Sequence, residues 1–450
     1  MNKHMDKHMD KHMDKHMNKQ LPDSRPVTDR LAIAVIGISV LLILAYEIFG
    51  VEKFILKVDP YEYYTYLPKW FIDHDFSYGS KYPIGVALLE MPFFLLAHGL
   101  AEDKSGYGLL YQYSVGIAAV FYYALGSCFI YKTLKKWFDC RISALVIALL
   151  TAGTFLPLYA TRYGGFSHIF TYAMAAIFIY AIADMEKAGY EEKWYKNLLF
   201  GMLVGLIFDL RNVNIFFLVY YLLYGLGALS RGSYINRLKK VFRPGRLVMN
   251  LAGFALPVFL QLLNWKLSTG HWITNSYGGE TFAYLTSPKI YEILLGDAKG
   301  LLMDCPVLIF AIIGIFLLGA DAVPGRKTGN KTGNKAGADA RIGTMAVLLI
   351  EIAISSTWWC WWFGGVYGMR PFIDIFPFMA LGMAAFLQWV ADYAGSISDK
   401  RRRIATIAFW TIVILAFVLI NAVYMYGEYS GTISQWLSNA WELRQAMKLR

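Results

Sequence analysis

The feature that most constrains this chain is a series of long apolar segments separated by short polar loops. Several of them contain 18 or more residues, enough for a helix to cross a hydrocarbon core about 30 Å thick. Hydrophobic residues make up 57% of the chain and charged residues 17%, whereas an ordinary soluble domain has roughly 25% charged residues. Because every backbone group must be hydrogen-bonded internally in lipid, each segment is predicted to be a helix.

These segments predict an all-α polytopic membrane protein with about eleven transmembrane helices. The predicted spans are 31–50, 109–131, 141–160, 165–184, 197–210, 213–230, 247–267, 300–320, 344–362, 371–393 and 404–427. The apolar run 83–100 is the ambiguous case. It contains Glu90 and two prolines, which a helix lying in the membrane interface tolerates better than a spanning helix does.

The distribution of basic residues predicts the orientation of the chain. With 83–100 left uncrossed and the N-terminus in the cytoplasm, about two thirds of the 43 lysines and arginines fall in cytoplasmic segments, as the positive-inside rule requires. This arrangement explains the net charge of +11 without a nucleic-acid partner. It places residues 51–108, containing juxtamembrane helices, outside the cytoplasmic membrane, together with 161–168, 268–299, 358–371 and a short tail, 428–450.

Two low-complexity segments lie on the cytoplasmic side of this prediction. Residues 1–30 form a basic tail whose KHMD-type repeats align four imidazoles if they are helical, so a metal site and a disordered tail are both open. The loop 321–343 contains a second four-residue repeat and is predicted not to pack. The four cysteines show no metal or redox spacing and fit small buried apolar side chains.

The first external loop carries the acidic motif Asp59-Pro60-Tyr61-Glu62. One interpretation is a capping box, in which Asp59 caps a helix, Pro60 opens it and Glu62 closes the box. A carboxylate held at the membrane surface can also take a proton from a hydroxyl or amine. Asp59 and Glu62 could alternatively bind a divalent cation, so metal dependence stays open.

Cations and aromatic side chains accompany these carboxylates on the predicted outer face. Arg162, Arg211 and Arg370 are suited to phosphate oxygens, although Arg211 could instead pair with Asp209 and Arg370 could extend to the interface. Four tryptophans within 358–362 exceed the needs of an interfacial belt and suit sugar stacking. His168 could donate to a phosphate, orient a carboxylate or simply pack.

The order of these features resembles the membrane-embedded type-C glycosyltransferases (GT-C), which include protein O-mannosyltransferases and the aminoarabinose transferases of lipid A. The acidic motif 59–64 follows the first span, and Lys81-Tyr82-Pro83 is similar to the Lys-aromatic-Pro element of that superfamily. Residues 369–377 look like its late Arg-aromatic motif, with Asp374 where a proline is common. Arg211-Asn212-Val213-Asn214 resembles a recurrent Arg/Asn turn.

The resemblance implies a GT-C bundle over 31–427 and transfer of a sugar from a polyprenyl-phosphate donor at the outer face, with inversion at the sugar carbon. By this analogy Asp59 is the catalytic base and Glu62 its partner. The remaining implied contacts are with substrate, and the acceptor is a glycan, a glycolipid or a protein. The residues expected to bind substrate, from this analogy and, for His168, from the chemistry of its imidazole, are Tyr63, Tyr64, Lys81, Tyr82, Arg162, His168, Arg211 and Arg370.

Two other classes of protein fit the same composition. A transporter or lipid flippase would carry ionisable residues near the membrane midplane, where this chain offers few, the nearest being Glu351 and Asp304. A scaffold protein could keep the bundle without any catalytic groove. The concentration of acids, cations and aromatics on the predicted outer face favours an enzyme over both alternatives.

Overall fold

The computed structural model describes residues 26–49, 56–190, 193–297, 299–320 and 333–430. Three sequence predictions lie largely outside this part: the N-terminal KHMD repeats with their imidazole stripe, most of the loop 321–343, and most of the tail 428–450.

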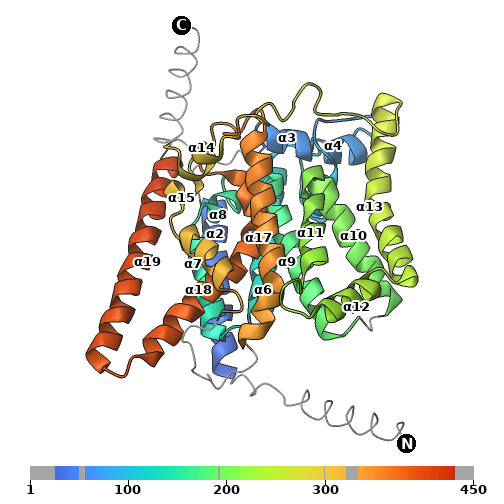
Figure 1. Cartoon of the computed structure of the whole chain (residues 1–450). Helices are drawn as coiled ribbons and strands as arrows, with labels where there is room; N and C mark the ends of the chain where they lie inside the picture. The colour runs from blue at the N-terminus through green and yellow to red at the C-terminus, as the bar shows by residue number, and fades with distance from the viewer. Residues whose placement is uncertain (1–25, 50–55, 191–192, 298, 321–332, 431–450) are drawn as a thin grey trace, which may run out of the picture.

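The described residues form a bundle of α-helices without strands, and each predicted span contains helix (Figure 1). Six helices are long and apolar enough to cross a membrane, counted over the described residues. The other predicted spans contain shorter or less apolar helices. The helices that fill the predicted spans are α2 (Pro26–Phe49), α6 (Leu109–Leu134), α7 (Cys140–Ala152), α8 (Leu156–Tyr159), α9 (Ser167–Lys187), α10 (Trp194–Leu210), α11 (Phe217–Leu223), α13 (Pro244–Thr269), α15 (Leu301–Asp304), α16 (Leu308–Leu317), α17 (Gly333–Thr357), α18 (Phe376–Ser396) and α19 (Lys400–Tyr429).

The remaining helices lie in the loops. The predicted external layer 51–108 contains α3 (Asp59–Tyr64), α4 (Tyr66–Phe71) and α5 (Gly85–Leu100). The basic loop 231–246 contains α12 (Arg231–Val241), which the sequence analysis did not anticipate. The short helix α14 (Ile290–Leu295) and the 3-10 turns η1 (Asn212–Phe216) and η2 (Arg370–Ile375) complete the described elements.

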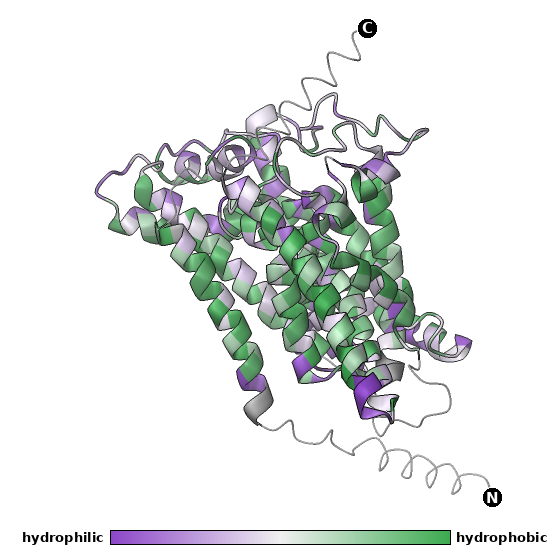
Figure 2. Cartoon of the chain, turned by 90° about the vertical axis from the view of Figure 1, so that its left-hand side faces the viewer, coloured by the Kyte–Doolittle hydropathy of each residue, from purple (hydrophilic) through white to green (hydrophobic). Residues whose placement is uncertain are grey.

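Burial separates a central set of helices from a peripheral one. The apolar windows of α6, α9 and α18 are 61%, 78% and 83% buried, whereas those of α2, α13 and α19 are 17%, 22% and 6% buried. Figure 1 shows α13 and α19 on opposite flanks of the bundle. Since these outer helices expose apolar side chains, lipid is the solvent that suits them. Figure 2 shows an apolar belt with hydrophilic residues gathered toward its two ends.

The two ends of the bundle differ in composition. Figure 1 places α12 and the α18–α19 turn, with its run Lys400-Arg401-Arg402-Arg403, at one end. The helices α3, α4 and α14 lie at the other end. The acidic motif and the basic loops are therefore separated by the length of the bundle, as the positive-inside interpretation requires.

The structure departs from the predicted elements at two spans and one loop. The span 141–160 is interrupted after Ala152, and 213–230 opens with the 3-10 turn η1 and ends as α-helix at Leu223. The prediction that the loop 321–343 does not pack is wrong for its second half, because helix α17 begins at Gly333, within the four-residue repeat of that loop. Helix α17 then carries that repeat into an otherwise apolar segment.

Close backbone contact between α16 and α18 depends on glycine. A Cβ atom built on Gly314 would lie 1.7 Å from the carbonyl oxygen of Gly382, so no side chain fits there. Small residues at such crossings allow membrane helices to approach closely.

Replacing Gly314 by Leu is expected to separate α16 from α18 and to destabilise the protein by about 3 kcal/mol or more, because the clash is with backbone. The matched control is Gly395→Leu on α18, where a Cβ atom meets nothing within 4 Å. Detergent-solubilised variants can be compared by thermal unfolding. Equal melting temperatures for the two variants would contradict the predicted contact.

Candidate active site

A cavity of about 470 Å³ lies at the end of the bundle that carries α3. It is formed by the starts of α3 and α9, the end of α10, the loop 271–289 and the segment 358–370. Its wall combines carboxylates, cations and aromatic rings. The residues that carry its chemistry are Asp59, Tyr63, Lys81, Tyr82, His168, Arg211, Tyr277, Glu280, Trp358, Trp359 and Arg370.

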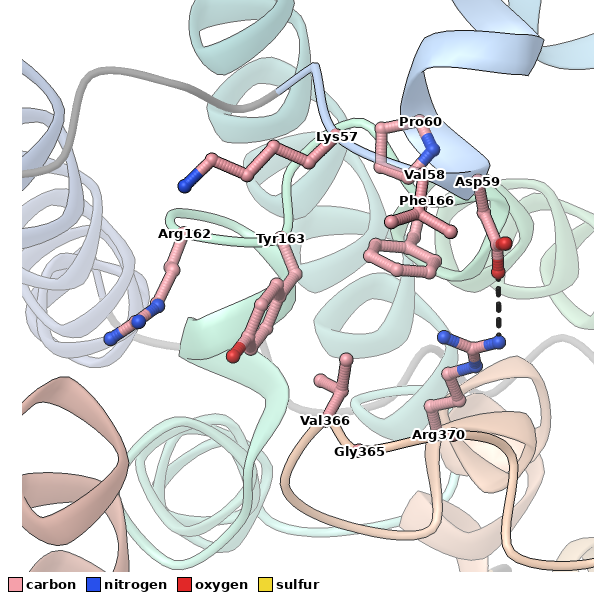
Figure 3. Close-up of a pocket in the computed structure, with 11 residues that line it drawn as sticks. Lys57, Val58, Asp59, Pro60, Arg162, Tyr163, Phe166, Gly365, Val366 and Arg370 are labelled. Carbon is pink, nitrogen blue, oxygen red and sulfur yellow. Dashed lines mark hydrogen bonds and ion pairs between the residues drawn. The ribbon is translucent and has the colours of Figure 1, made fainter. Parts of the chain in front are cut away.

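Asp59 is the first residue of α3, and its carboxylate is held by Arg370. Arg370 Nη2 donates to Asp59 Oδ2 over 2.9 Å, and both side chains are more than four fifths buried (Figure 3). The Arg370 guanidinium also lies 4.6 Å from the centroid of the Phe166 ring. Oδ2 is the oxygen that takes part in this pair, and the Tyr82 phenol is a second hydrogen-bond partner of the Asp59 carboxylate.

The predicted capping box is wrong. Helix α3 begins at Asp59, Val58 precedes it with a φ of 51°, and no side chain caps the helix. A positive φ is rare for a β-branched residue, and backbone strain of this kind gathers at functional sites. The acid therefore has no local capping role, and its observed partner, Arg370, is 311 residues away in the sequence.

Glu62 does not join Asp59 in the cavity. Its carboxylate accepts a hydrogen bond from Ser80 Oγ at 2.9 Å, and Glu62 lines neither of the cavities that Asp59 lines. The described residues contain no group of three or more His, Cys, Asp or Glu side chains arranged to hold a metal ion. Tyr64 also lies away from the cavity, because its buried phenol donates to the carbonyl of Gly106.

Lys81 is a further cation that lines the cavity. Its ammonium forms an ion pair with Glu280 and lies 5.4 Å from the ring centroids of both Tyr82 and Tyr277. Sequence reasoning singled out the loop 268–299 but chose neither Glu280 nor Tyr277. Nothing in the local sequence distinguishes these two side chains from the other polar residues of that loop.

The Tyr82 ring stacks on Tyr63, with ring centroids 4.3 Å apart. Burial raises the pKa of the Tyr82 phenol, and the nearby charges of Tyr63 and Asp59 in their ionised forms raise it further. Tyr82 is therefore a neutral phenol at physiological pH, able to donate a hydrogen bond. Tyr63 donates its own hydroxyl proton to Ser167.

Two of the cavity residues, His168 and Arg211, belong to a buried hydrogen-bond network. The centre of this network is Asp374, which is fully buried. Its Oδ1 lies 2.8 Å from His168 Nδ1, and its Oδ2 accepts from Arg211 Nη1 at 2.6 Å and Asn214 Nδ2 at 2.8 Å. Since a carboxylate only accepts, Nδ1 of the imidazole carries the proton and Nε2 is the acceptor of the neutral ring. Arg211 therefore pairs with Asp374, and the alternative interpretation, an ion pair with Asp209, is wrong.

Two tryptophans of the aromatic run line the cavity. Trp358 packs edge-on against Phe282, with ring centroids 5.2 Å apart, and against Tyr277, at 6.1 Å. Trp359 lines the same cavity, whereas Trp361 and Trp362 do not. Of the four cations predicted to bind substrate, Lys81, Arg211 and Arg370 line this cavity, whereas Arg162 lines a neighbouring one.

No model of a protein family matches this sequence, and neither does any curated protein. Several solved structures match this chain in fold, including the following two. The oligosaccharyltransferase of Archaeoglobus fulgidus in its apo form superposes with a TM-score of 0.50 at 12% identity, over 90% of this chain and 56% of that one. ArnT from Cupriavidus metallidurans bound to undecaprenyl phosphate superposes with a TM-score of 0.51 at 13% identity. The match covers 92% of this chain and 77% of that one.

Both of these proteins have the GT-C fold. The chain therefore has the fold of the GT-C membrane glycosyltransferases, as the motif order predicted. It spans little more than half the length of the archaeal enzyme.

Proposed function

We propose that this protein is a glycosyltransferase that moves a sugar from a polyprenyl-phosphate donor to an acceptor at the outer face of the cytoplasmic membrane. The observation that carries the proposal is the convergence of two carboxylates, three cations and several aromatic rings in a single cavity. That cavity lies at the end of the bundle opposite the basic loops, which supports an external active site.

The donor phosphate belongs among Lys81, Arg211 and Arg370. Each arginine uses only one nitrogen for its carboxylate partner, and a guanidinium carries five N–H donors. Lys81 can exchange Glu280 for a phosphate oxygen, since both are anionic partners. The sugar then stacks against the aromatic wall formed by Tyr82, Trp358 and Trp359.

Asp59 is the base of the proposed transfer. The acceptor's hydroxyl or amine loses its proton to Asp59 Oδ1 as its oxygen or nitrogen forms a bond to the anomeric carbon. The bond from that carbon to the phosphate oxygen breaks, and its electron pair leaves with the prenyl phosphate. The proton later passes from Asp59 to water or to the departing phosphate. The arginines stabilise the charge that develops on the phosphate.

The proposed stereochemistry is inversion. Retention by a double displacement needs a nucleophilic carboxylate with a second carboxyl group about 5–5.5 Å away. Glu62 is turned toward Ser80, and Glu280 is paired with Lys81. A single displacement with Asp59 as base uses the groups in the cavity as they stand.

Replacing Lys81 by Gln is expected to weaken binding of undecaprenyl phosphate about tenfold, because a direct phosphate contact is lost. Native mass spectrometry of the full chain in detergent measures this binding. Lys104→Gln is the matched control, since Lys104 is exposed and donates to the carbonyl of His98 outside the cavity. Unchanged binding by the Lys81 variant would contradict the proposed donor site.

A further inference from the structure

A second cavity adjoins the candidate active site. It has a volume of about 300 Å³ and shares Asp59, Phe166, Gly364 and Arg370 with the first cavity. The Asp59–Arg370 pair therefore lines both cavities, and a molecule in either cavity can reach the carboxylate. Figure 3 shows the pair at one end of the second cavity.

The second cavity ends in two cations. Figure 3 shows the Lys57 amine and the Arg162 guanidinium at the end of the cavity remote from the Asp59–Arg370 pair. Arg162 is held in place by the carbonyls of Glu428, at 2.8 Å, and Tyr429, at 3.3 Å. Lys57 is exposed and forms no ion pair within the described part of the chain. This end of the cavity suits an anionic group.

Between these cations and Asp59 the lining is mostly apolar. It consists of Val58, Pro60, Phe166 and Val366, with the ring of Tyr163 along one side. Tyr163 donates its hydroxyl proton to the Glu428 carboxylate. The space between the two ends suits a small headgroup whose hydroxyl or amine reaches Asp59.

An apolar groove of about 480 Å³ lies next to this cavity. It is lined by Ile38, Leu42 and Ile43 of α2 and by Ala148 of α7, and it reaches Thr161 and Tyr429. Thr161 directly precedes Arg162, and Arg162 donates to the carbonyl of Tyr429. The cationic end of the cavity thus borders a groove with one wall from α2, a helix that exposes apolar surface.

We propose that the acceptor is an anionic membrane lipid. Its charged group binds Lys57 and Arg162, its hydroxyl or amine faces Asp59, and a hydrocarbon chain lies in the α2–α7 groove. The argument for a lipid is that the cations and the groove adjoin, since a water-soluble anion would leave the apolar groove unused. This inference rests on the proposed function, because the acceptor must meet the donor sugar at Asp59.

The first test uses phosphatidylglycerol, whose headgroup carries one anionic phosphate and free hydroxyls. Native mass spectrometry of the full chain should show it binding together with undecaprenyl phosphate, and binding more tightly than phosphatidylcholine. Lys57→Gln should weaken the binding of phosphatidylglycerol about fivefold, which is the effect of one basic residue on the binding of an anionic lipid. Lys57→Arg should bind phosphatidylglycerol as tightly as the parent protein does. Neither variant should alter the binding of undecaprenyl phosphate, and Lys104→Gln should alter the binding of neither lipid.

The second test fills the groove. Leu42 is exposed on α2, so Leu42→Trp should fold and should weaken phosphatidylglycerol without affecting undecaprenyl phosphate. The proposal is overturned if Lys57→Gln weakens undecaprenyl phosphate instead, since the cavity would then hold the donor. It is also overturned if Leu42→Trp has no effect while sn-glycerol 3-phosphate displaces the lipid fully, since the ligand would then be a soluble anion. Normal undecaprenyl phosphate binding in Lys81→Gln contradicts the donor site instead, and leaves the anionic-lipid site standing.

Discussion

Asp59→Asn is expected to lower the rate of sugar transfer about a hundredfold or more while leaving the protein folded. Asparagine keeps the size of the side chain, and its carbonyl oxygen can still accept from Arg370. It cannot take the acceptor's proton, so the rate should fall by roughly 10²–10⁴, the usual contribution of a positioned base. The measurement is transfer of a radiolabelled sugar from a panel of undecaprenyl-phosphate sugars in membranes containing the variant.

The matched control for this experiment is Asp73→Asn. Asp73 belongs to the same external layer, is partly exposed and forms an i, i+4 ion pair with Lys69, but it lines neither cavity. Its transfer rate should equal that of the parent protein. Transfer by Asp59→Asn within a factor of about three of the parent would rule out Asp59 as the base, provided that both variants melt at similar temperatures.

The bundle could be predicted from the sequence because its main determinant is local. A run of apolar residues long enough to cross lipid has to be helical, and each predicted span does contain helix. What the pattern could not give was where a span breaks. The 3-10 turn η1 after Arg211 and the interruption after Ala152 depend on contacts with distant segments, which hydropathy does not record.

Part of the candidate site could be predicted because the predicted topology showed which polar residues lie on the outer face. Asp59, Lys81, Arg211 and Arg370 were chosen for their places on the outer face, and all four line one cavity. Glu62 was chosen because it could close a capping box with Asp59 and because the resemblance implies that it is the partner of Asp59. The short helix α3 instead directs Asp59 to Arg370 and Glu62 to Ser80. Partners as remote as Glu280 for Lys81 carry no signal in a single sequence.

Asp374 is the clearest case of a site residue that the sequence could not identify. In the sequence it only replaces a proline that is common at this place in the motif, and nothing indicates its role. In the structure this buried carboxylate fixes the imidazole of His168 and the guanidinium of Arg211, both of which line the cavity. An arginine buried beside a carboxylate is costly to leave unpaired. Asp374 is therefore a positioning residue, which sets the tautomer of one cavity group and the direction of another.

Asp374→Asn is expected to lower both stability and donor binding. If its NH₂ group faces Arg211 and Asn214, the amide meets donors, and if its NH₂ group faces His168, the imidazole is forced into its other tautomer. Loss of the charge partner of Arg211 should cost about 3–5 kcal/mol of folding free energy. In the protein that remains folded, KM for an undecaprenyl-phosphate sugar should rise at least tenfold, with a smaller change in kcat, because Arg211 is one of the proposed donor contacts.

The matched control is Asp209→Asn, the same change at a buried carboxyl group on α10. Neither oxygen of Asp209 has a hydrogen-bond partner among the described residues, so its neutral replacement should be as stable as the parent protein or more stable. Thermal unfolding with and without undecaprenyl phosphate separates the two effects of Asp374→Asn. A lower melting temperature with a normal ligand-induced shift would mean that Asp374 only holds helices together. A reduced shift, absent from Asp209→Asn, would show that the carboxylate orients the groups that bind the phosphate.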